Sequence, residues 1–193
     1  MKSILFLLIV ICILIFSGLI YSNTTVKGLQ VDRYWSVLEG DQLIPPTITY
    51  AHGFIGLKFR EDFNQLVYNV NVNNIDNITG INLYSYSNNT QKSSMLLDLL
   101  KETNELKVKG DDINITNVSP YKEKGTVALG GVTSDDLQGE LKGKSLAHLL
   151  ELMMNGGVYV EVQTKKFPLG EIRGDEFVPI DRIFPDITDF QWD

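Results

Sequence analysis

The charged side chains best placed to perform chemistry lie near the C-terminal end of the sequence. Glu171 and Arg173 are two residues apart, so an extended strand would place both on one face. From that face a carboxylate and a guanidinium could bind a polar ligand. The same pair also suits a structural ion-pair network at the last hairpin, because the neighbouring glycines permit a bulge or a tight turn. The spacing favours the structural interpretation.

Oxygen ligands for a metal ion are a second chemical option. Glu161, Glu171 and Asp175 could approach one another across neighbouring strands and bind Ca²⁺ through their carboxylates. No Asp-x-Asp-x-Asp loop supports such a site, so calcium binding stays an alternative. Thiolate and imidazole chemistry lack reagents, because the chain has one cysteine and two histidines. Zinc fingers, iron–sulfur sites, cysteine nucleophiles and disulfide-bonded miniature folds are therefore excluded.

Aromatic side chains provide a third option. Tyr84, Tyr86 and Tyr159 occupy positions that strand alternation assigns to polar faces. Together they could form an exposed patch that contacts carbohydrate or protein. The alternative is three tyrosines at the rim of a sheet, each with a hydrated hydroxyl group. The sequence leaves both interpretations open.

Composition limits the class of protein and the class of partner. The 193 residues are 44% hydrophobic and 21% charged, which is typical of one globular domain with a substantial core. The chain has 17 basic and 24 acidic residues, and no run of Lys and Arg could neutralise phosphates. Nucleic acid and anionic membrane surfaces are therefore not expected as partners.

The N-terminus has the features of an export signal. One positive charge precedes thirteen consecutive apolar residues at positions 4–16. A cleaved secretory signal and an uncleaved anchor both fit, because a helix over 4–20 would be about 25 Å long, the short end of a membrane span. Residues 1–22 are predicted to be a signal peptide or a membrane anchor, followed by a linker at 23–28.

Five Asn-x-Ser/Thr sequons agree with export, because such sites are modified in secreted and surface proteins of hosts that glycosylate asparagine. The predicted glycosylation sites are Asn23, Asn77, Asn88, Asn114 and Asn117. The chain is therefore expected outside the cytoplasm, either secreted or held at a membrane by its N-terminal helix.

The body of the chain has the period-two pattern of β-strands. Residues 66–72 and 158–165 alternate apolar and polar side chains, as strands with one hydrated face do. Further strands are predicted at 31–38, 49–59, 78–86, 105–109, 126–129 and 170–177. Many short strands without a βαβ rhythm predict an all-β antiparallel fold, either a Greek-key, immunoglobulin-like β-sandwich or a barrel.

Helical patterns are rare in this body. One short helix is predicted between Ser145, which can cap it, and Gly156, which can end it, and His148 within it is expected at the surface. Residues 94–102 fit either a second short helix or an edge strand. The acidic, aromatic tail at 179–193 is expected to pack partly against the domain or to serve as a partner peptide.

Four motifs along the chain resemble those of the CHRD, or chordin-type, domain family. They are the opening segment 38–53, the strand 65–72, the segment 137–149 and the ending 156–174, GGVYVEVQTKKFPLGEIRG. They follow the family's order and cover residues 30–176. The resemblance implies an extracellular β-domain, here residues 29–178, that interacts with other proteins.

Three histidines typical of that family are replaced in this chain. By the resemblance, Asn82 and Tyr84 lie in its T-x-A-H-I-H segment and Gln163 in its V-H-T ending. Alternation places all three away from the core, where a site could form. An amide or a phenol cannot replace imidazole as a neutral metal ligand or as a base near pH 7. A transition-metal site is not expected here, and no cofactor is predicted.

The resulting hypothesis is a non-catalytic binding or envelope-structural module that meets an unidentified extracellular protein or glycan. Its candidate binding residues are Asn82, Tyr84, Tyr159, Glu161, Gln163, Glu171 and Arg173. The alternative is a metal-binding envelope protein or an enzyme that uses the three carboxylates named above as oxygen ligands.

Overall fold

The computed structural model describes residues 33–86, 93–104 and 124–180. All of them belong to one unit of the chain, residues 31–193. The predicted signal or anchor, the linker, the strand at 105–109 and the tail beyond residue 180 lie outside the described residues. Within the described ranges, no helix is long and apolar enough to cross a membrane.

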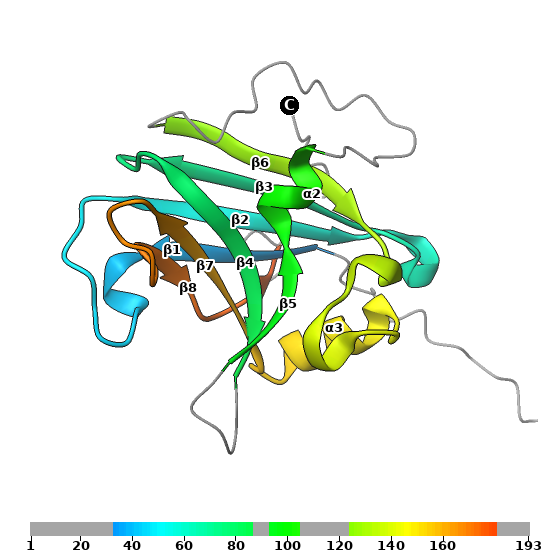
Figure 1. The fold of residues 1–193 in the computed structure, drawn as a ribbon. Helices are drawn as coiled ribbons and strands as arrows, with labels where there is room; N and C mark the ends of the chain where they lie inside the picture. The colour runs from blue at the N-terminus through cyan, green and yellow to red at the C-terminus, as the bar shows by residue number, and fades with distance from the viewer. Residues whose placement is uncertain (1–32, 87–92, 105–123, 181–193) are drawn as a thin grey trace, which may run out of the picture. The chain divides into compact units, whose positions relative to one another are not determined.

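In the described part of the chain, nine strands form one antiparallel sheet (Figure 1). Their bounds are β1 Arg33–Glu39, β2 His52–Phe59, β3 Leu66–Asn73, β4 Ile78–Ser85, β5 Ser94–Asp98, β6 Lys124–Val132, β7 Val158–Thr164, β8 Ile172–Gly174 and β9 Val178–Pro179. The order across the sheet is β5-β4-β7-β8-β1-β2-β3-β6, and β9 also pairs with β1. Neighbours in sequence are therefore often not neighbours in the sheet.

The sheet is curled into a half-barrel. The helix α2, Leu99–Asn104, contacts both β4 near one edge and β6 at the other, so it lies across the opening. The Tyr68 hydroxyl on β3 donates to the Leu99 carbonyl of α2 over 2.8 Å. The mostly β, antiparallel prediction is confirmed. Of the two predicted arrangements, the structure is closer to a barrel than to a sandwich, because the nine described strands belong to one continuous sheet.

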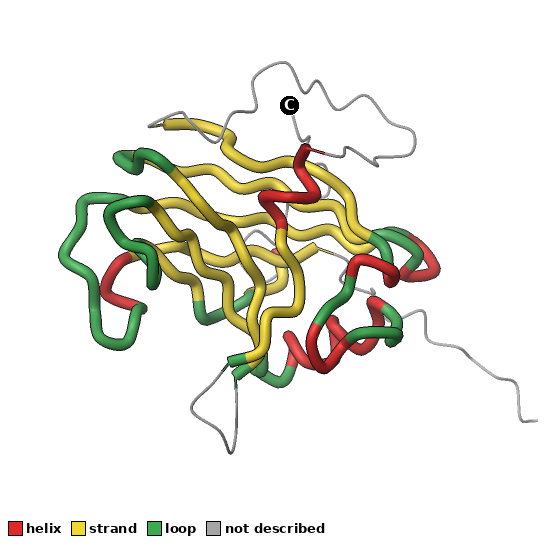
Figure 2. Tube along the Cα trace, in the orientation of Figure 1, coloured by secondary structure: helices red, strands yellow, loops and turns green. Residues whose placement is uncertain are grey.

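Among the described residues, two short α-helices, α2 and α3, accompany the sheet (Figure 2). The second, α3 at Leu146–Met154, confirms the predicted helix: Ser145 is its N-cap residue, and Gly156 beyond its end has φ of +68°. The Ser145 hydroxyl lies 2.9 Å from Nδ1 of His148, which is exposed as predicted. Short 3-10 turns are η1 Gly40–Gln42, η2 Glu61–Phe63, η3 Ser134–Asp136 and η4 Gly139–Leu141.

Two segments differ from the sequence-based expectation in detail. Residues 94–102 contain both predicted alternatives, because the edge strand β5 runs directly into α2. The strand predicted at 126–129 is longer in the structure, because β6 continues through Gly130 and Gly131, which lie opposite Tyr68 and its neighbour. A Cβ on Gly130 would lie 2.5 Å from the Tyr68 hydroxyl oxygen, so this glycine makes room for a buried ring.

Strand alternation fills the core on the inner face of the sheet. On β3, every second side chain from Leu66 to Val72 is buried and those between are partly exposed, as predicted. On β7, by contrast, Tyr159 and Glu161 are buried although they alternate with the core residues Val158, Val160 and Val162. Side chains on both faces of β7 are therefore shielded from water.

Candidate functional site

The strands β4, β7 and β8 lie side by side, and their register brings most of the predicted site residues together (Figure 1). Asn82 pairs with Glu161, and Glu161 pairs with Arg173. Tyr84 pairs with Tyr159 in the next row. Residues directly opposite one another share a face, so these side chains lie on the outer face of the sheet.

Arg173 connects the aromatic side chains of this face. Its guanidinium carbon lies 3.7 Å from the centre of the Tyr159 ring and 5.2 Å from that of Tyr86. Its Nη2 donates to the Tyr86 hydroxyl over 2.7 Å, and its Nε pairs with the Asp175 carboxylate. A planar, weakly hydrated guanidinium suits simultaneous stacking and ion pairing. Arg173 thereby joins residues from several strands.

Amide side chains form the other part of the group. Gln163 Nε2 donates to the Tyr84 hydroxyl over 3.3 Å and to Glu161 Oε1 over 3.0 Å. Asn82 Nδ2 donates to the same Tyr84 oxygen over 3.4 Å. Tyr84 also stacks on Tyr159, with ring centres 5.3 Å apart and 20° between the ring planes. Because a phenol oxygen that accepts two hydrogen bonds still carries its own hydrogen, Tyr84 can donate to a further group.

Gly80 allows the two amides to approach Tyr84. It pairs with Gln163 across the strands. A Cβ on Gly80 would lie 2.7 Å from Gln163 Oε1 and 3.0 Å from Asn82 Nδ2. A larger residue would displace both amides. Gly80 carries no signal in the sequence, because only the strand register places it beneath the two amides.

These residues form what we call the outer cluster: Gly80, Asn82, Tyr84, Tyr86, Tyr159, Glu161, Gln163, Arg173 and Asp175. Asn82, Tyr159, Glu161 and Arg173 are each less than 9% exposed. Burial raises the pKa of Glu161, and the hydrogen bond from Gln163 and the charge of Arg173 offset this only in part. Burial likewise raises the pKa of the three tyrosine hydroxyls, so they stay protonated at neutral pH.

The charge of Arg173 is held firmly. Burial alone would lower the pKa of its guanidinium, but the hydrogen bonds to Tyr86 and Asp175 raise it overall. The aromatic part of the outer cluster therefore has a fixed positive centre, which is paired with a carboxylate.

Glu171 lies apart from this cluster, contrary to the expectation that it shares a face with Arg173. Its carboxylate accepts from Thr49 Oγ1 over 2.8 Å and from Thr164 Oγ1 over 2.7 Å. The regular strand β8 begins only at Ile172, so its alternation does not extend to Glu171, and the preceding Gly170 has φ of +117°, a conformation that favours glycine. Glu171 therefore holds the loop between β1 and β2, and it is not the partner of Arg173.

The three carboxylates considered as calcium ligands have separate partners. Glu161 accepts from Gln163, Glu171 accepts from two threonines, and Asp175 pairs with Arg173. Among the described residues, no group of three or more His, Cys, Asp or Glu side chains is placed to hold a metal ion. This geometry gives the calcium alternative no support.

A row of polar side chains crosses the whole sheet on the outer face, one from each of eight strands. In spatial order the row is Asp98, Asn82, Glu161, Arg173, Glu39, His52, Asn73 and Lys124. Its part in β4, β7 and β8 is buried, whereas Glu39, His52 and Lys124 are exposed. Sequence analysis singled out three of the eight as binding candidates, because the row exists only once the register is known.

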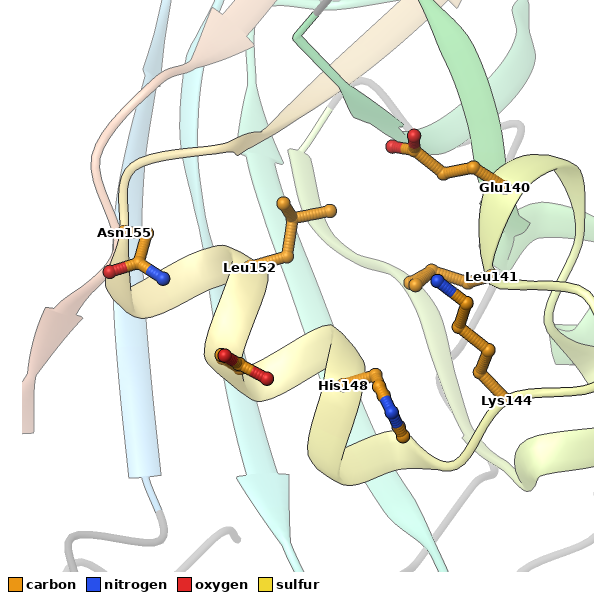
Figure 3. Close-up of a pocket in the computed structure, with 7 residues that line it drawn as sticks. Glu140, Leu141, Lys144, His148, Leu152 and Asn155 are labelled. Carbon is orange, nitrogen blue, oxygen red and sulfur yellow. The ribbon is translucent and has the colours of Figure 1, made fainter.

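A shallow hollow of about 230 Å³ lies between η4 and α3 (Figure 3). It is lined by Glu140, Leu141, Lys144, His148, Glu151, Leu152 and Asn155. Figure 3 shows the Glu140, His148 and Asn155 side chains pointing in different directions rather than toward one point. The hollow therefore presents no convergent set of polar groups.

Of the five predicted glycosylation sites, Asn77 lies among the described residues and the other four do not. Asn77 is exposed between β3 and β4, and its Nδ2 donates to Asp76 Oδ2 over 2.7 Å. The position is accessible to modification, which stays a prediction.

Comparison with protein families supports the resemblance seen in the motifs. The family model described as the CHRD domain matches residues 34–175, which include every member of the outer cluster. No curated protein and no solved structure matches the chain.

Proposed function

Because the chain belongs to the CHRD domain family, we propose that its β-domain is a non-catalytic binding module that acts outside the cytoplasm. The binding surface in this proposal is the outer cluster, and its ligand is a neutral glycan. The observation that carries the proposal is the Tyr84 hydroxyl, which accepts from Asn82 and Gln163 and keeps its own hydrogen for a ligand.

The charges of the outer cluster favour an uncharged ligand. Arg173 is already paired with Asp175, and Glu161 already accepts from Gln163. A charged ligand would have to disrupt one of these contacts, which are costly to break when buried. A sugar hydroxyl could instead accept from Tyr84 and donate to an amide oxygen, while the partly exposed rings of Tyr84 and Tyr86 offer apolar surface.

The arrangement of possible catalytic groups supports a non-catalytic role. Neither described histidine belongs to the outer cluster: His52 Nδ1 lies 3.1 Å from the Tyr50 carbonyl oxygen, and His148 contacts Ser145. The cluster itself offers tyrosines with raised pKa rather than a nucleophile beside a base. Binding is therefore the simpler use of these groups.

Location outside the cytoplasm rests on the N-terminal sequence and the sequons. The proposal is tested by adding protease to intact cells of the native host. A domain outside the cytoplasm is cleaved without cell lysis, whereas protection until lysis contradicts the proposal.

Glycan binding is tested with the full-length chain in detergent on an array of neutral and acidic glycans. We expect binding to neutral glycans that Tyr84→Phe and Gln163→Ala each weaken at least tenfold. Tyr50→Phe is the matched control, because Tyr50 is 92% exposed and lies outside the outer cluster. Binding that only acidic glycans show, or that Tyr84→Phe leaves unchanged, contradicts the proposal.

A further inference from the structure

One end of the sheet carries four large apolar side chains that almost nothing covers. Ile48 is 97% exposed, Tyr50 92%, Leu169 87% and Ile44 84%. Three of them belong to the β1–β2 loop, and Leu169 belongs to the β7–β8 loop. We call these four residues the apolar tip. Soluble proteins seldom leave so much apolar surface together without a use for it.

The two loops of the apolar tip are held to each other. Thr47 Oγ1 donates to the Gly170 carbonyl over 3.4 Å, and Thr49 Oγ1 donates to the Glu171 carboxylate. Thr47 N also donates to the Gly40 carbonyl over 2.8 Å. The threonines thus point toward the domain, and Ile48 between them points outward. Burying such a preordered segment costs little conformational entropy.

We propose that the apolar tip inserts into the surface of a lipid bilayer. Its side chains stand clear of the domain on loop ends, which suits a fluid apolar phase better than the packed, pocketed surface of a protein partner. Tyr50 has the amphipathic ring that favours the membrane–water boundary, and Lys165 and Lys166 are exposed on the same loop as Leu169. Their long side chains can reach the headgroups.

The charges near the apolar tip indicate insertion driven by apolar burial. The exposed residues Lys165 and Lys166 are balanced by Asp41, in η1 before the first loop, and by Asp76. Asp76 lies close by, since Lys165 N donates to the carbonyl of the adjacent Asn77 over 3.0 Å. Binding should therefore depend little on anionic lipid, in agreement with the lack of basic runs in the sequence.

If the N-terminal segment is a membrane anchor, the chain between it and the domain is long enough for the apolar tip to reach the bilayer. In this respect the inference rests on the proposed function. The twelve residues between position 20 and Arg33 span up to about 40 Å when extended. Seven-residue β1 separates Arg33 from the loop end by roughly 23 Å. The tether is thus long enough for the apolar tip to touch the same bilayer.

The test uses the full-length chain with Cys12→Ser and one new cysteine that carries an environment-sensitive fluorophore. Ile48→Cys reports on the apolar tip. Lys142→Cys is the control, because it is exposed before α3, at the other end of β7 from Leu169. The labelled chain is mixed with phosphatidylcholine vesicles, with or without 30% phosphatidylglycerol, and flotation is measured in parallel.

Insertion predicts a blue shift at position 48, quenching by lipids with nitroxide groups on their acyl chains, and neither effect at position 142. Both lipid compositions should give similar shifts. The double variant Ile44→Asp, Leu169→Asp should reduce the quenching at least tenfold without lowering the melting temperature.

A chain that floats with vesicles but shows no fluorescence shift at position 48 overturns the inference and leaves anchoring by the N-terminal segment intact. If the chain does not float with vesicles but the fluorophore at position 48 shows a blue shift when vesicles are in excess, the N-terminal segment is not an anchor, and the insertion of the apolar tip is still supported. A shift without vesicles that grows with protein concentration indicates self-association and overturns the inference.

Discussion

The two halves of the outer face differ in how strand alternation is used. In β1, β2 and β3 the outward side chains, among them Trp35, Phe54 and Asn69, are partly exposed, as expected for a hydrated face. In β4, β7 and β8 the outward residues Glu161 and Arg173 are less than 9% exposed. The same period-two rule thus produces a wet surface in one half and a buried polar layer in the other.

The two halves differ in burial because their outward side chains differ in how many other side chains they contact. In the first half the contacts are pairs or short chains: Trp35 stacks on Phe54 with ring centres 4.3 Å apart, and Asn71 accepts from Thr126 Oγ1 over 3.1 Å and donates to Asn69 Oδ1 over 2.8 Å. In the second half Arg173 contacts Tyr159 on β7, Tyr86 just after β4 and Asp175 just after its own strand. A connected network shields its members from water, and its loss should cost more than the loss of one pair.

The largest effect is expected when the centre of the network is removed. Arg173→Met keeps much of the side-chain volume but leaves Asp175 and the Tyr86 hydroxyl without their partner. We expect a loss of about 2–3 kcal/mol in the free energy of unfolding, because partly buried polar groups become unpaired. Urea denaturation measures it.

Lys124→Met is the matched control, since Lys124 belongs to the same polar row but lies on the exposed half. Its effect should stay within about 0.5 kcal/mol. Equal effects of the two substitutions would remove the distinction between the halves.

Sequence patterns predict which face a side chain occupies but not how it is covered. Alternation placed Asn82, Tyr84 and Gln163 on the outer face, where the structure has them. It failed at Glu171, because that residue lies in the loop before β8 begins at Ile172, outside the regular strand that the prediction assumed. The contacts of Arg173 depend on strand order, which places β7 beside both β4 and β8 although α3 and β6 intervene in sequence. No local pattern contains that information.

A smaller effect is expected at the glycine beneath the amides. Gly80→Ala would place a methyl group 2.7 Å from Gln163 Oε1 and 3.0 Å from Asn82 Nδ2. Both amides must then move from Tyr84, and the loss of their hydrogen bonds to its hydroxyl should cost about 1 kcal/mol in unfolding free energy. The neighbouring Thr79→Ala, at an exposed position, should change stability by less than about 0.5 kcal/mol. A stable Gly80→Ala variant would show that the amides are not tightly packed there.

The buried carboxylate of Glu161 predicts a pH dependence of stability that originates in the buried half of the outer face. Burial raises the pKa of Glu161 in the folded state above its ordinary value of 4.5, so the folded chain holds this proton more strongly than the unfolded chain. Its contribution to stability therefore falls as the pH rises from about 4.5 through the raised value. Glu161→Gln should remove this fall, so the variant gains stability relative to the native chain across that range. Thermal unfolding at successive pH values measures the difference. If the stability advantage of Glu161→Gln over the native chain instead shrinks as the pH rises, Arg173 and Gln163 lower the pKa of Glu161 more than burial raises it.

The smallest effect on stability should accompany the largest effect on binding. Tyr84→Phe keeps the ring that stacks on Tyr159 and removes the oxygen that accepts from Gln163 and Asn82. Gln163 is partly exposed and keeps its hydrogen bond to Glu161, and the two lost hydrogen bonds are long, so the cost should be about 0.5–1 kcal/mol. Glycan binding should nevertheless fall at least tenfold, because the donor that meets the ligand is gone. Equilibrium unfolding and array binding of the same variant separate the two quantities. If stability falls by 2 kcal/mol or more and binding does not change, the Tyr84 hydroxyl is a structural element like Arg173, and the cluster as a whole is packing rather than a site.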